Sequence, residues 1–238
     1  WDEQKRYLVS IMRIPAYVAM ILLLASATVQ LTSAALIVRP RHYGPSRVKA
    51  ACYALIGFIC VQPFMYGQHA DADFLCRSFT VIGGLLLLVW SEKDHQRRRE
   101  DTGLPQDLSD VSSDRLQLVG RLLLTFLFFF QALYSEKGGL HNIFVRPSFF
   151  LVLSGVLLLG LSALICVGFH TEWSALLLCA VLFVSNFFMY PYWSMHQHVQ
   201  DYYRYYFYQT LSIIGGLMLL ALHGPGGISI DKGNKKAI

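Results

Sequence analysis

The sequence predicts an all-α membrane protein, a polytopic transmembrane helical bundle with about seven spans. Of the 238 residues, 55% are hydrophobic and 15% are charged, whereas soluble domains carry about 25% charged residues. The apolar residues also stand in long uninterrupted blocks and do not recur at helical or strand period, so they are not the buried faces of one water-soluble core. A lipid bilayer is the environment that both observations fit.

The first three predicted spans occupy residues 15–38, 50–66 and 74–90. The first contains no charged side chain. The second contains Pro63 near its far end, where a kink is expected. The third carries Arg77 one turn inside, and a charge within a span is costly unless it is paired or reaches the interface.

Four further spans follow the polar stretch 91–114. The first of these is extended over 116–134, with Arg121 at its entrance, because a crossing needs roughly 19 residues. A very short link at His170 joins the next two spans. The last three spans are 148–169, 173–193 and 207–222.

The orientation follows from the Lys and Arg residues between the spans. A cytosolic C-terminus places about twice as many of them in the cytosol as on the opposite side, in agreement with the positive-inside rule. We therefore expect residues 1–238 to form one transmembrane domain with a cytosolic loop at 91–114 and a cytosolic tail at 224–238. Seven spans put Trp1 on the lumenal side without a signal peptide, so we expect a truncated N-terminus and a parent protein of eight spans.

Motifs for catalysis are scarce in this sequence. It contains no GxSxG, HExxH or P-loop pattern and no pair of acids in the middle of a span. The five cysteines all fall in apolar blocks, without CxxC pairs or metal-ligand spacing, and are expected to pack between helices. The sequence therefore predicts that the protein is not an enzyme and needs no cofactor or metal. Its basic residues cluster beside apolar blocks, which indicates membrane topology and not nucleic acid binding.

Arg77 and the acids before it are the strongest polar candidates for a site. Arg77 can reach the lumenal interface or pair with Asp71, so it is either a structural anchor or part of a lumen-facing site. Other polar residues and glycine pairs within the spans are expected to join helices. They are Gln62, Gln131, Asn186, Gln209, Gly83, Gly84, Gly215 and Gly216.

The lumenal stretch 196–206 is a second candidate, rich in tyrosine. A metal site from His196, His198 and Asp201 is a weak alternative there, because one HxH pattern lacks further fixed ligands. Tyrosines at the mouth of a helix are typical of an interfacial belt, and they also form adaptable contact surface for peptides. The candidate binding residues are Asp71, Arg77, Asp201, Tyr202, Arg204 and Tyr205.

The chain ends in Asp231-Lys-Gly-Asn-Lys235-Lys236-Ala-Ile238, with lysines three and four places from its end. This pattern resembles the dilysine signal that returns membrane proteins from the Golgi to the endoplasmic reticulum through the COPI coat. Lysine is sparse in this chain, which favours a signal over chance placement. The alternative is an ordinary positive-inside flank.

The residues around the last span carry a family resemblance. They read Tyr205-Tyr-Phe-Tyr-Gln209-Thr-Leu-Ser-Ile-Ile-Gly-Gly, then Gly224-Pro-Gly-Gly-Ile-Ser-Ile-Asp231 and Lys235-Lys236. Asp71-Ala-Asp-Phe-Leu-Cys-Arg77, Gly120-Arg121 and Gly168-Phe-His-Thr add to them. Together these stretches resemble the Surfeit locus protein 4 family, over nearly the whole chain. Tyr206 departs from the family pattern, which has an acid before Phe-Tyr-Gln.

The resemblance implies a fold related to DoxX-like membrane proteins and a cargo receptor of the early secretory pathway. Such a receptor binds soluble secretory proteins in the lumen of the endoplasmic reticulum, enters COPII vesicles with them and is recycled from the Golgi by its dilysine signal. The implied partners are cargo, subunits of both coats and membrane lipid. The implied locations are the membranes of the endoplasmic reticulum, the ER–Golgi intermediate compartment and the early Golgi.

On this reading the candidate binding residues contact cargo, and Lys235 and Lys236 form the retrieval signal. A DoxX-like membrane oxidoreductase and a small-molecule transporter stay open as alternatives. The sequence does not identify the cargo, the position of the groove that holds it, or the oligomeric state.

Overall fold

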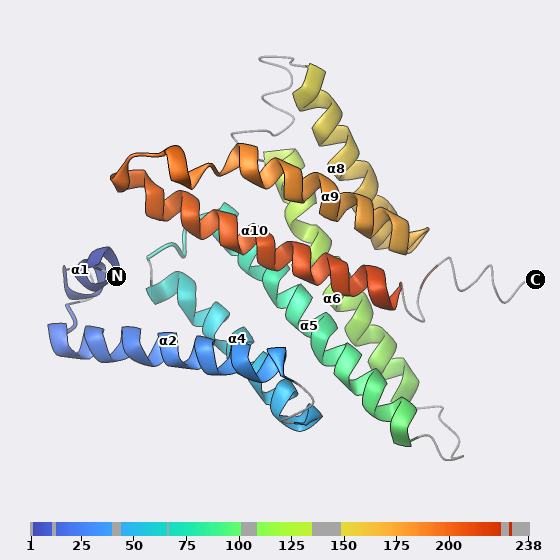
Figure 1. Cartoon of the computed structure of the whole chain (residues 1–238), viewed down its shortest axis with the longest axis horizontal. Coiled ribbons are helices and arrows are strands. Elements are labelled where there is room, and N and C mark those ends of the chain that lie inside the picture. The colour runs from blue at the N-terminus through green and yellow to red at the C-terminus, as the bar shows by residue number, and fades with distance from the viewer. Residues whose placement is uncertain are drawn as a thin grey trace, which may run out of the picture. The chain divides into compact units, whose positions relative to one another are not determined.

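The computed structural model describes residues 2–10, 13–39, 44–65, 67–100, 109–134, 149–224 and 229, and every regular element among them is a helix (Figure 1). The helices are α1 (Asp2–Ser10), α2 (Ala16–Val38), α4 (Pro45–Met65), α5 (Ala72–Glu100), α6 (Ser109–Tyr134), α8 (Phe149–Val167), α9 (Thr171–Met189), the short 3₁₀ helix η1 (Tyr192–Ser194) and α10 (Gln197–His223).

The predicted all-α polytopic class is confirmed. Within the described residues, five helical segments are long and apolar enough to cross a membrane, and a shorter apolar segment is Gly155–Val167. The five are Ala16–Val38, Pro45–Met65, Ala72–Asp94, Thr171–Ser194 and Gln200–His223. The other two predicted spans, 116–134 and 148–169, coincide with α6 and α8, so the count of seven stays a prediction.

The chain divides into two compact units. The first comprises residues 1–78 and 92–101, and the second comprises residues 79–91 and 102–238. Helix α5 begins in the first unit and continues in the second. Each unit has packing contacts of its own, which are described in turn.

In the first unit, α2 packs against α1 and α4. Leu8 of α1 lies in a buried cluster with Ala19 and Leu23 of α2, and the amide of Ile14 donates a hydrogen bond to the carbonyl of Leu8 at 3.2 Å. Many large apolar side chains of α2 point outward, and Leu31 is 71% exposed. This inverted pattern fits a bilayer, where lipid tails cover large side chains and small ones pack between helices.

In the second unit, α6 packs on α8, α8 on α9, and α9 on α10, which returns to contact α6. Helices α9 and α10 run side by side in opposite directions, with η1 connecting them (Figure 1). The amide nitrogen of Asn186 on α9 donates to the carbonyl oxygen of Phe207 on α10 at 3.2 Å. The predicted role of Asn186 as a link between helices is therefore confirmed, whereas the side chain of Gln131 lies outside the described residues.

Glycines let three helices of this unit approach closely. A Cβ atom added to Gly83 of α5 would lie 2.7 Å from the carbonyl oxygen of Gly120 on α6, and one added to Gly84 would lie 3.3 Å from the Cα of Gly216 on α10. The prediction that these glycines are packing sites is confirmed for Gly83, Gly84 and Gly216. It is wrong for Gly215, which has no atom within 4 Å of an added Cβ.

Three helices extend well beyond the predicted spans. Helix α10 begins at Gln197, ten residues before the predicted start at 207. Its first turns contain no Gly or Pro to end a helix, and the side chains of Asp201 and Arg204 pair across one turn. Helices α5 and α6 likewise extend into the stretch 91–114, which is helical up to Glu100 and again from Ser109. That stretch is therefore largely helical, and its cytosolic location stays a prediction.

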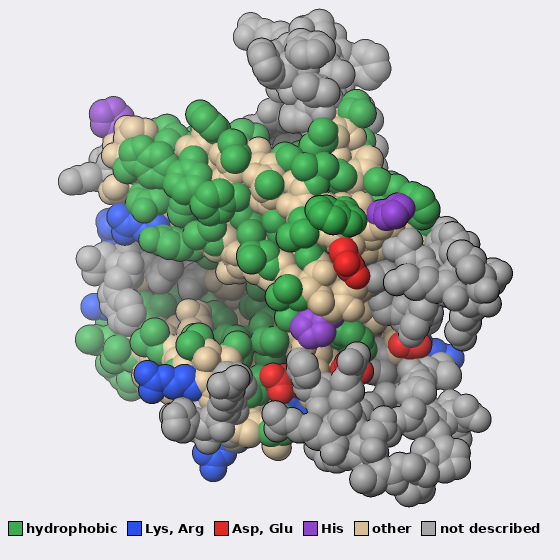
Figure 2. Space-filling model, turned by 45° about the vertical axis from the view of Figure 1, so that its right-hand side comes forward, with side chains coloured by type: hydrophobic (Ala, Val, Ile, Leu, Met, Phe, Trp, Pro, Cys, Tyr) green, Lys and Arg blue, Asp and Glu red, His purple; other side chains and the backbone are tan. Residues whose placement is uncertain are grey.

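Hydrophobic side chains cover most of the described surface on the face shown in Figure 2. Large apolar residues of the described part of the chain are among the most exposed, such as Phe188 and Leu222 at 79% and 80%. A soluble monomer rarely exposes contiguous apolar patches larger than a few hundred Å². The described surface is thus suited to lipid.

Substitution of Gly83 by Ala should destabilise the protein, because the new methyl group would meet the backbone of α6. We expect a loss of about 1–3 kcal/mol, typical of overpacking. The matched control is Gly215→Ala, also in the middle of a helix but facing open space, which should be neutral or slightly stabilising since Ala favours helix. Thermal unfolding of both variants in detergent measures the difference, and equal melting temperatures would contradict the close approach.

Candidate functional site

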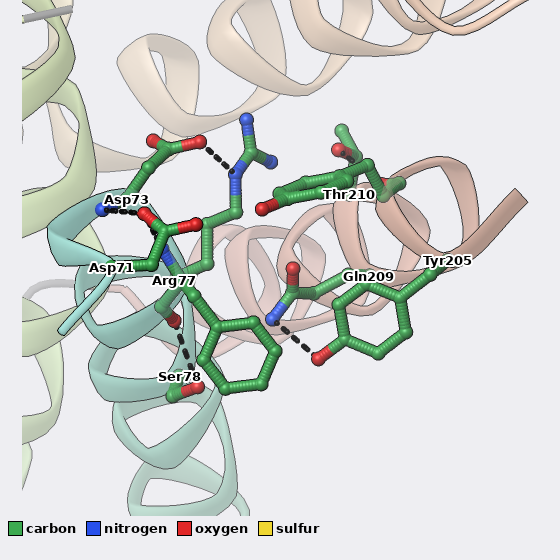
Figure 3. Close-up of polar contacts among 9 residues, drawn as sticks. Asp71, Asp73, Arg77, Ser78, Tyr205, Gln209 and Thr210 are labelled. Carbon is green, nitrogen blue, oxygen red and sulfur yellow. Dashed lines mark hydrogen bonds and ion pairs between the residues drawn. The ribbon is translucent and has the colours of Figure 1, made fainter. Parts of the chain in front are cut away.

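Asp71 caps the N-terminus of α5. Its Oδ1 accepts hydrogen bonds from the backbone amides of Asp73 at 3.0 Å and Phe74 at 3.4 Å (Figure 3). These amides have no partner inside the helix, and an acid at this position also faces the positive end of the helix dipole. Asp71 thus has a structural task in addition to any role in binding.

Arg77 is buried in the second turn of α5, with 3% of its side chain exposed. Its Nε donates to Oδ2 of Asp73 at 3.3 Å. Arg77 was expected either to reach the lumenal interface or to pair with Asp71. Residues four apart face each other on a helix and residues six apart do not, which favours Asp73 as a partner. The burial and this short-range pair support the interpretation of Arg77 as an anchor.

In the second unit, an aromatic cluster surrounds the turn from α9 to α10. The ring of Tyr192 lies 5.3 Å from the ring of Phe207, and Phe187 lies 5.5 Å from the same ring. Trp193 contacts both Phe187 and Phe207, at 6.0 and 6.2 Å. Pairs at these separations each contribute about 0.5–1.5 kcal/mol beyond the apolar area that they bury. The cluster therefore fixes η1 against the beginning of α10.

Tyr206 is the buried centre of a second group of rings. It is 1% exposed, stacks on Tyr190, the residue after α9, at 5.7 Å and lies 4.5 Å from the ring of Tyr202. Tyr202 itself is 41% exposed. The residue that departs from the family pattern is thus a packing residue in this structure, and its neighbour Tyr202 offers the accessible ring.

A charged pair lies on the exposed side of these rings. Nη1 of Arg204 lies 3.5 Å from Oδ1 of Asp201, and the side chains are 47% and 66% exposed. The guanidinium carbon of Arg204 also lies 5.8 Å from the centre of the Tyr192 ring, within the range of a cation–π contact. Because both charges are exposed, their mutual attraction is weak and both remain available to a ligand.

Tyr205 and Gln209 extend the polar surface one turn further along α10. Nε2 of Gln209 donates to the hydroxyl of Tyr205 at 3.3 Å (Figure 3). Oε1 of Gln209 is buried and accepts no hydrogen bond within the described part of the chain. Gln209 was expected to bond between helices, but this hydrogen bond lies within α10.

The candidate residues fall into two separate groups. Asp201, Tyr202, Arg204 and Tyr205 come together on the first turns of α10, whereas Asp71 and Arg77 belong to the first unit. Lys235 and Lys236 lie outside the described residues, as does the side chain of His198. No group of three His, Cys, Asp or Glu residues that could hold a metal occurs among the residues searched.

Sequence reasoning missed several aromatic residues of the cluster. They are Phe187 at the end of α9, Tyr190 just after it, and Trp193 in η1. Their signal was the aromatic run Phe187-Phe-Met-Tyr-Pro-Tyr-Trp193, in which Pro191 ends the helix and turns the rings back toward the next one.

The family model described as the SURF4 family matches residues 1–237. The chain belongs to the SURF4 family. It is 32% identical to the Surfeit locus protein 4 homolog of Schizosaccharomyces pombe, over 99% of this chain and 74% of that protein. It is 29% identical to the Surfeit locus protein 4 homolog of Drosophila melanogaster, over 99% and 82%. It is 28% identical to the ER-derived vesicles protein ERV29 of Saccharomyces cerevisiae, over 99% and 70%. No solved structure matches this SURF4-family chain.

The cap at Asp71 can be separated from its charge by two substitutions. Asp71→Ala removes the acceptor of two amide hydrogen bonds, and we expect a loss of about 1 kcal/mol of stability. Asp71→Asn keeps a side-chain oxygen at the same place and should stay within a few tenths of a kcal/mol of the parent, since Asn and Asp are about equally good caps. Thermal unfolding in detergent distinguishes the two variants. Equal losses for both would mean that the charge, and not the cap, stabilises α5.

Proposed function

We propose that this SURF4-family protein is a cargo receptor of the early secretory pathway. It binds soluble secretory proteins in the lumen of the endoplasmic reticulum, accompanies them into COPII vesicles and returns from the Golgi through COPI. Family membership supports this role, as does the name of the yeast relative, a protein of vesicles derived from the endoplasmic reticulum. The structural observation that carries the proposal is the exposed pair Asp201–Arg204 beside the aromatic cluster.

The cargo ligand that fits this surface is a short peptide end. Its free amine pairs with a carboxylate such as Asp201, and its side chains pack against exposed rings such as Tyr202. Aromatic rings supply contact area at low entropy cost, because only two side-chain torsions need to be fixed. No covalent chemistry is required of any residue.

The location of the surface follows from the proposed topology. Helix α10 begins at the lumenal side and ends at the cytosolic side, so the pair Asp201–Arg204 faces the compartment from which cargo arrives. The tail with Lys235 and Lys236 then emerges where coat subunits bind. The same topology places Asp71 and Arg77 toward the lumen. The protein cycles between the endoplasmic reticulum, the ER–Golgi intermediate compartment and the early Golgi.

Loss of a lumenal carboxylate should weaken cargo capture. Asp201→Asn or Asp71→Asn removes one negative charge and keeps the shape of the side chain, so folding and localisation should be intact. We expect cargo affinity to fall on the order of tenfold, the value of one charge-assisted hydrogen bond. Co-precipitation of secreted proteins with the receptor, together with a comparative secretome of cells that express each variant, measures the effect.

The control is a charge swap in the stretch Arg97–Arg99, which lies on the opposite side of the membrane in the proposed topology. It should leave cargo binding unchanged. If the lumenal variants bind cargo normally, or are only degraded, then Asp71 and Asp201 are structural residues and cargo binds elsewhere.

Replacement of Lys235 and Lys236 by serine should move the protein toward the Golgi. The physical reason is that retrieval depends on two positive charges near the chain end, which serine lacks. Quantitative immunofluorescence against Golgi and endoplasmic reticulum markers checks this outcome, and Lys232→Ser serves as a control for lost charge alone. An unchanged distribution would mean that the two lysines are only a topology flank.

A further inference from the structure

Two buried polar side chains lie one turn apart on α6. Gln117 and Arg121 are each 1% exposed, and residues four apart share one face of a helix. A guanidinium buried in a spanning helix is costly. Polar groups must therefore lie against this face of α6. The ends of other helices supply these groups.

Gln117 holds the chain where it leaves α10. Its Nε2 donates a hydrogen bond to the carbonyl oxygen of Gly224 at 3.0 Å. Gly224 has a φ of 74°, a value that favours glycine, and its amide closes α10 by bonding to the carbonyl of Leu220 at 2.9 Å. A Cβ at this position would also lie 3.3 Å from Oε1 of Glu172 on α9. The first residue of the tail is thus fixed from two sides.

Arg121 lies near the tail at a second residue, Ser229. A Cβ atom added to Gly168, at the end of α8, would lie 3.0 Å from Nη1 of Arg121 and 2.7 Å from the Cβ of Ser229. Gly168 also has a φ of 79°. The absence of a side chain at Gly168 therefore leaves room for both the guanidinium and Ser229, which lies five residues beyond Gly224.

A third contact fixes the last turn of α10. The Oγ of Ser91 on α5 lies 2.7 Å from Nε2 of His223, and the ring of Trp90 lies edge-on to the same imidazole at 5.7 Å. Nδ1 of His223 contacts the carbonyl of Leu219 at 3.0 Å. The end of α10 is consequently held by both α5 and α6 before the tail begins.

We propose that Gln117, Arg121 and Gly168 form a docking site for the chain's own tail, which fixes the starting point of the segment that carries Lys235 and Lys236. Lys235 follows Ser229 by six positions, so docking of Ser229 limits the reach of this lysine from the bundle to about 20 Å. The role of tail docking in retrieval rests on the function proposed above, whereas the docking itself does not.

Accessibility of residue 229 tests the docking directly. The variant Ser229→Cys in the full-length chain is treated with a membrane-impermeant maleimide in sealed, cytosol-side-out vesicles, and the signal of the chain without this cysteine is subtracted. We expect slow labelling. Addition of Gly168→Ala should accelerate it on the order of tenfold, because the methyl group displaces Ser229 and shifts the local opening equilibrium.

Two further variants keep the test decisive. Gly160→Ala, in α8 and with open space around an added Cβ, should leave labelling slow. Arg121→Met removes the guanidinium and keeps an apolar side chain suited to a spanning helix, so it should fold and also accelerate labelling. Equal rates in the Gly168→Ala, Arg121→Met and Gly160→Ala backgrounds would overturn the docking. Labelling that occurs only after permeabilisation would overturn it as well, since the tail would then be lumenal.

A localisation assay separates this proposal from the proposed function. Gly168→Ala should shift the protein toward the Golgi while Lys235 and Lys236 are present, and should add nothing once both are serine. If the serine variant itself stays in place, the retrieval function fails and the labelling rates still decide the docking. Faster labelling with unchanged retrieval would overturn the claim that docking positions the signal.

Discussion

Close backbone contact between helices is the constraint on which the second unit depends. Lipid tails are as apolar as leucine, so burial of apolar area does not drive helices together inside a bilayer. Dispersion contacts and hydrogen bonds must do so, and both need short distances. At Gly83 the backbone of α5 lies so near α6 that a single methyl group would collide, and Gly84 faces Gly216 in the same way. Helix α5 therefore touches two partners through adjacent residues.

Buried polar groups complete this packing, because in lipid each unsatisfied group costs several kcal/mol. Thr125 of α6 bonds to the carbonyl of Arg121 within its own helix and lies 2.9 Å from the sulfur of Cys166 on α8. Asn186 reaches from α9 to the carbonyl of Phe207 on α10. Each such contact between helices fixes the rotation of one helix against the next.

The sequence was sufficient for the fold class because hydropathy reports directly on which segments avoid water. It was also sufficient for the packing role of Gly83, although the same reasoning failed at Gly215. It was insufficient at the start of α10, where a tyrosine-rich stretch reads equally well as an interfacial loop and as a helix. The stretch is helical in the structure, where the rings of Tyr202 and Tyr206 lie one turn apart with their centres separated by 4.5 Å. Side-chain pairs at that spacing stabilise a helix.

Candidate site residues were harder to interpret than spans. Residue type alone identified Asp71 and Arg77 as unusual, but not that the first caps a helix and the second pairs with Asp73. Contacts between residues far apart in the sequence were even harder to predict. Nothing near Gly168 in the sequence indicates that Ser229 lies against it, because that contact depends on how α6, α8 and α10 end together.

The length of α10 has a consequence for what can bind at its beginning. Its 27 residues form a rod about 40 Å long, whereas the hydrocarbon layer is about 30 Å thick. In the topology proposed above, the surplus of about two turns lies in the headgroup layer, at the end that carries Asp201 and Arg204. A ligand held there stays outside the hydrocarbon layer, so only its contacting end must fit and the rest of the molecule can be of any size.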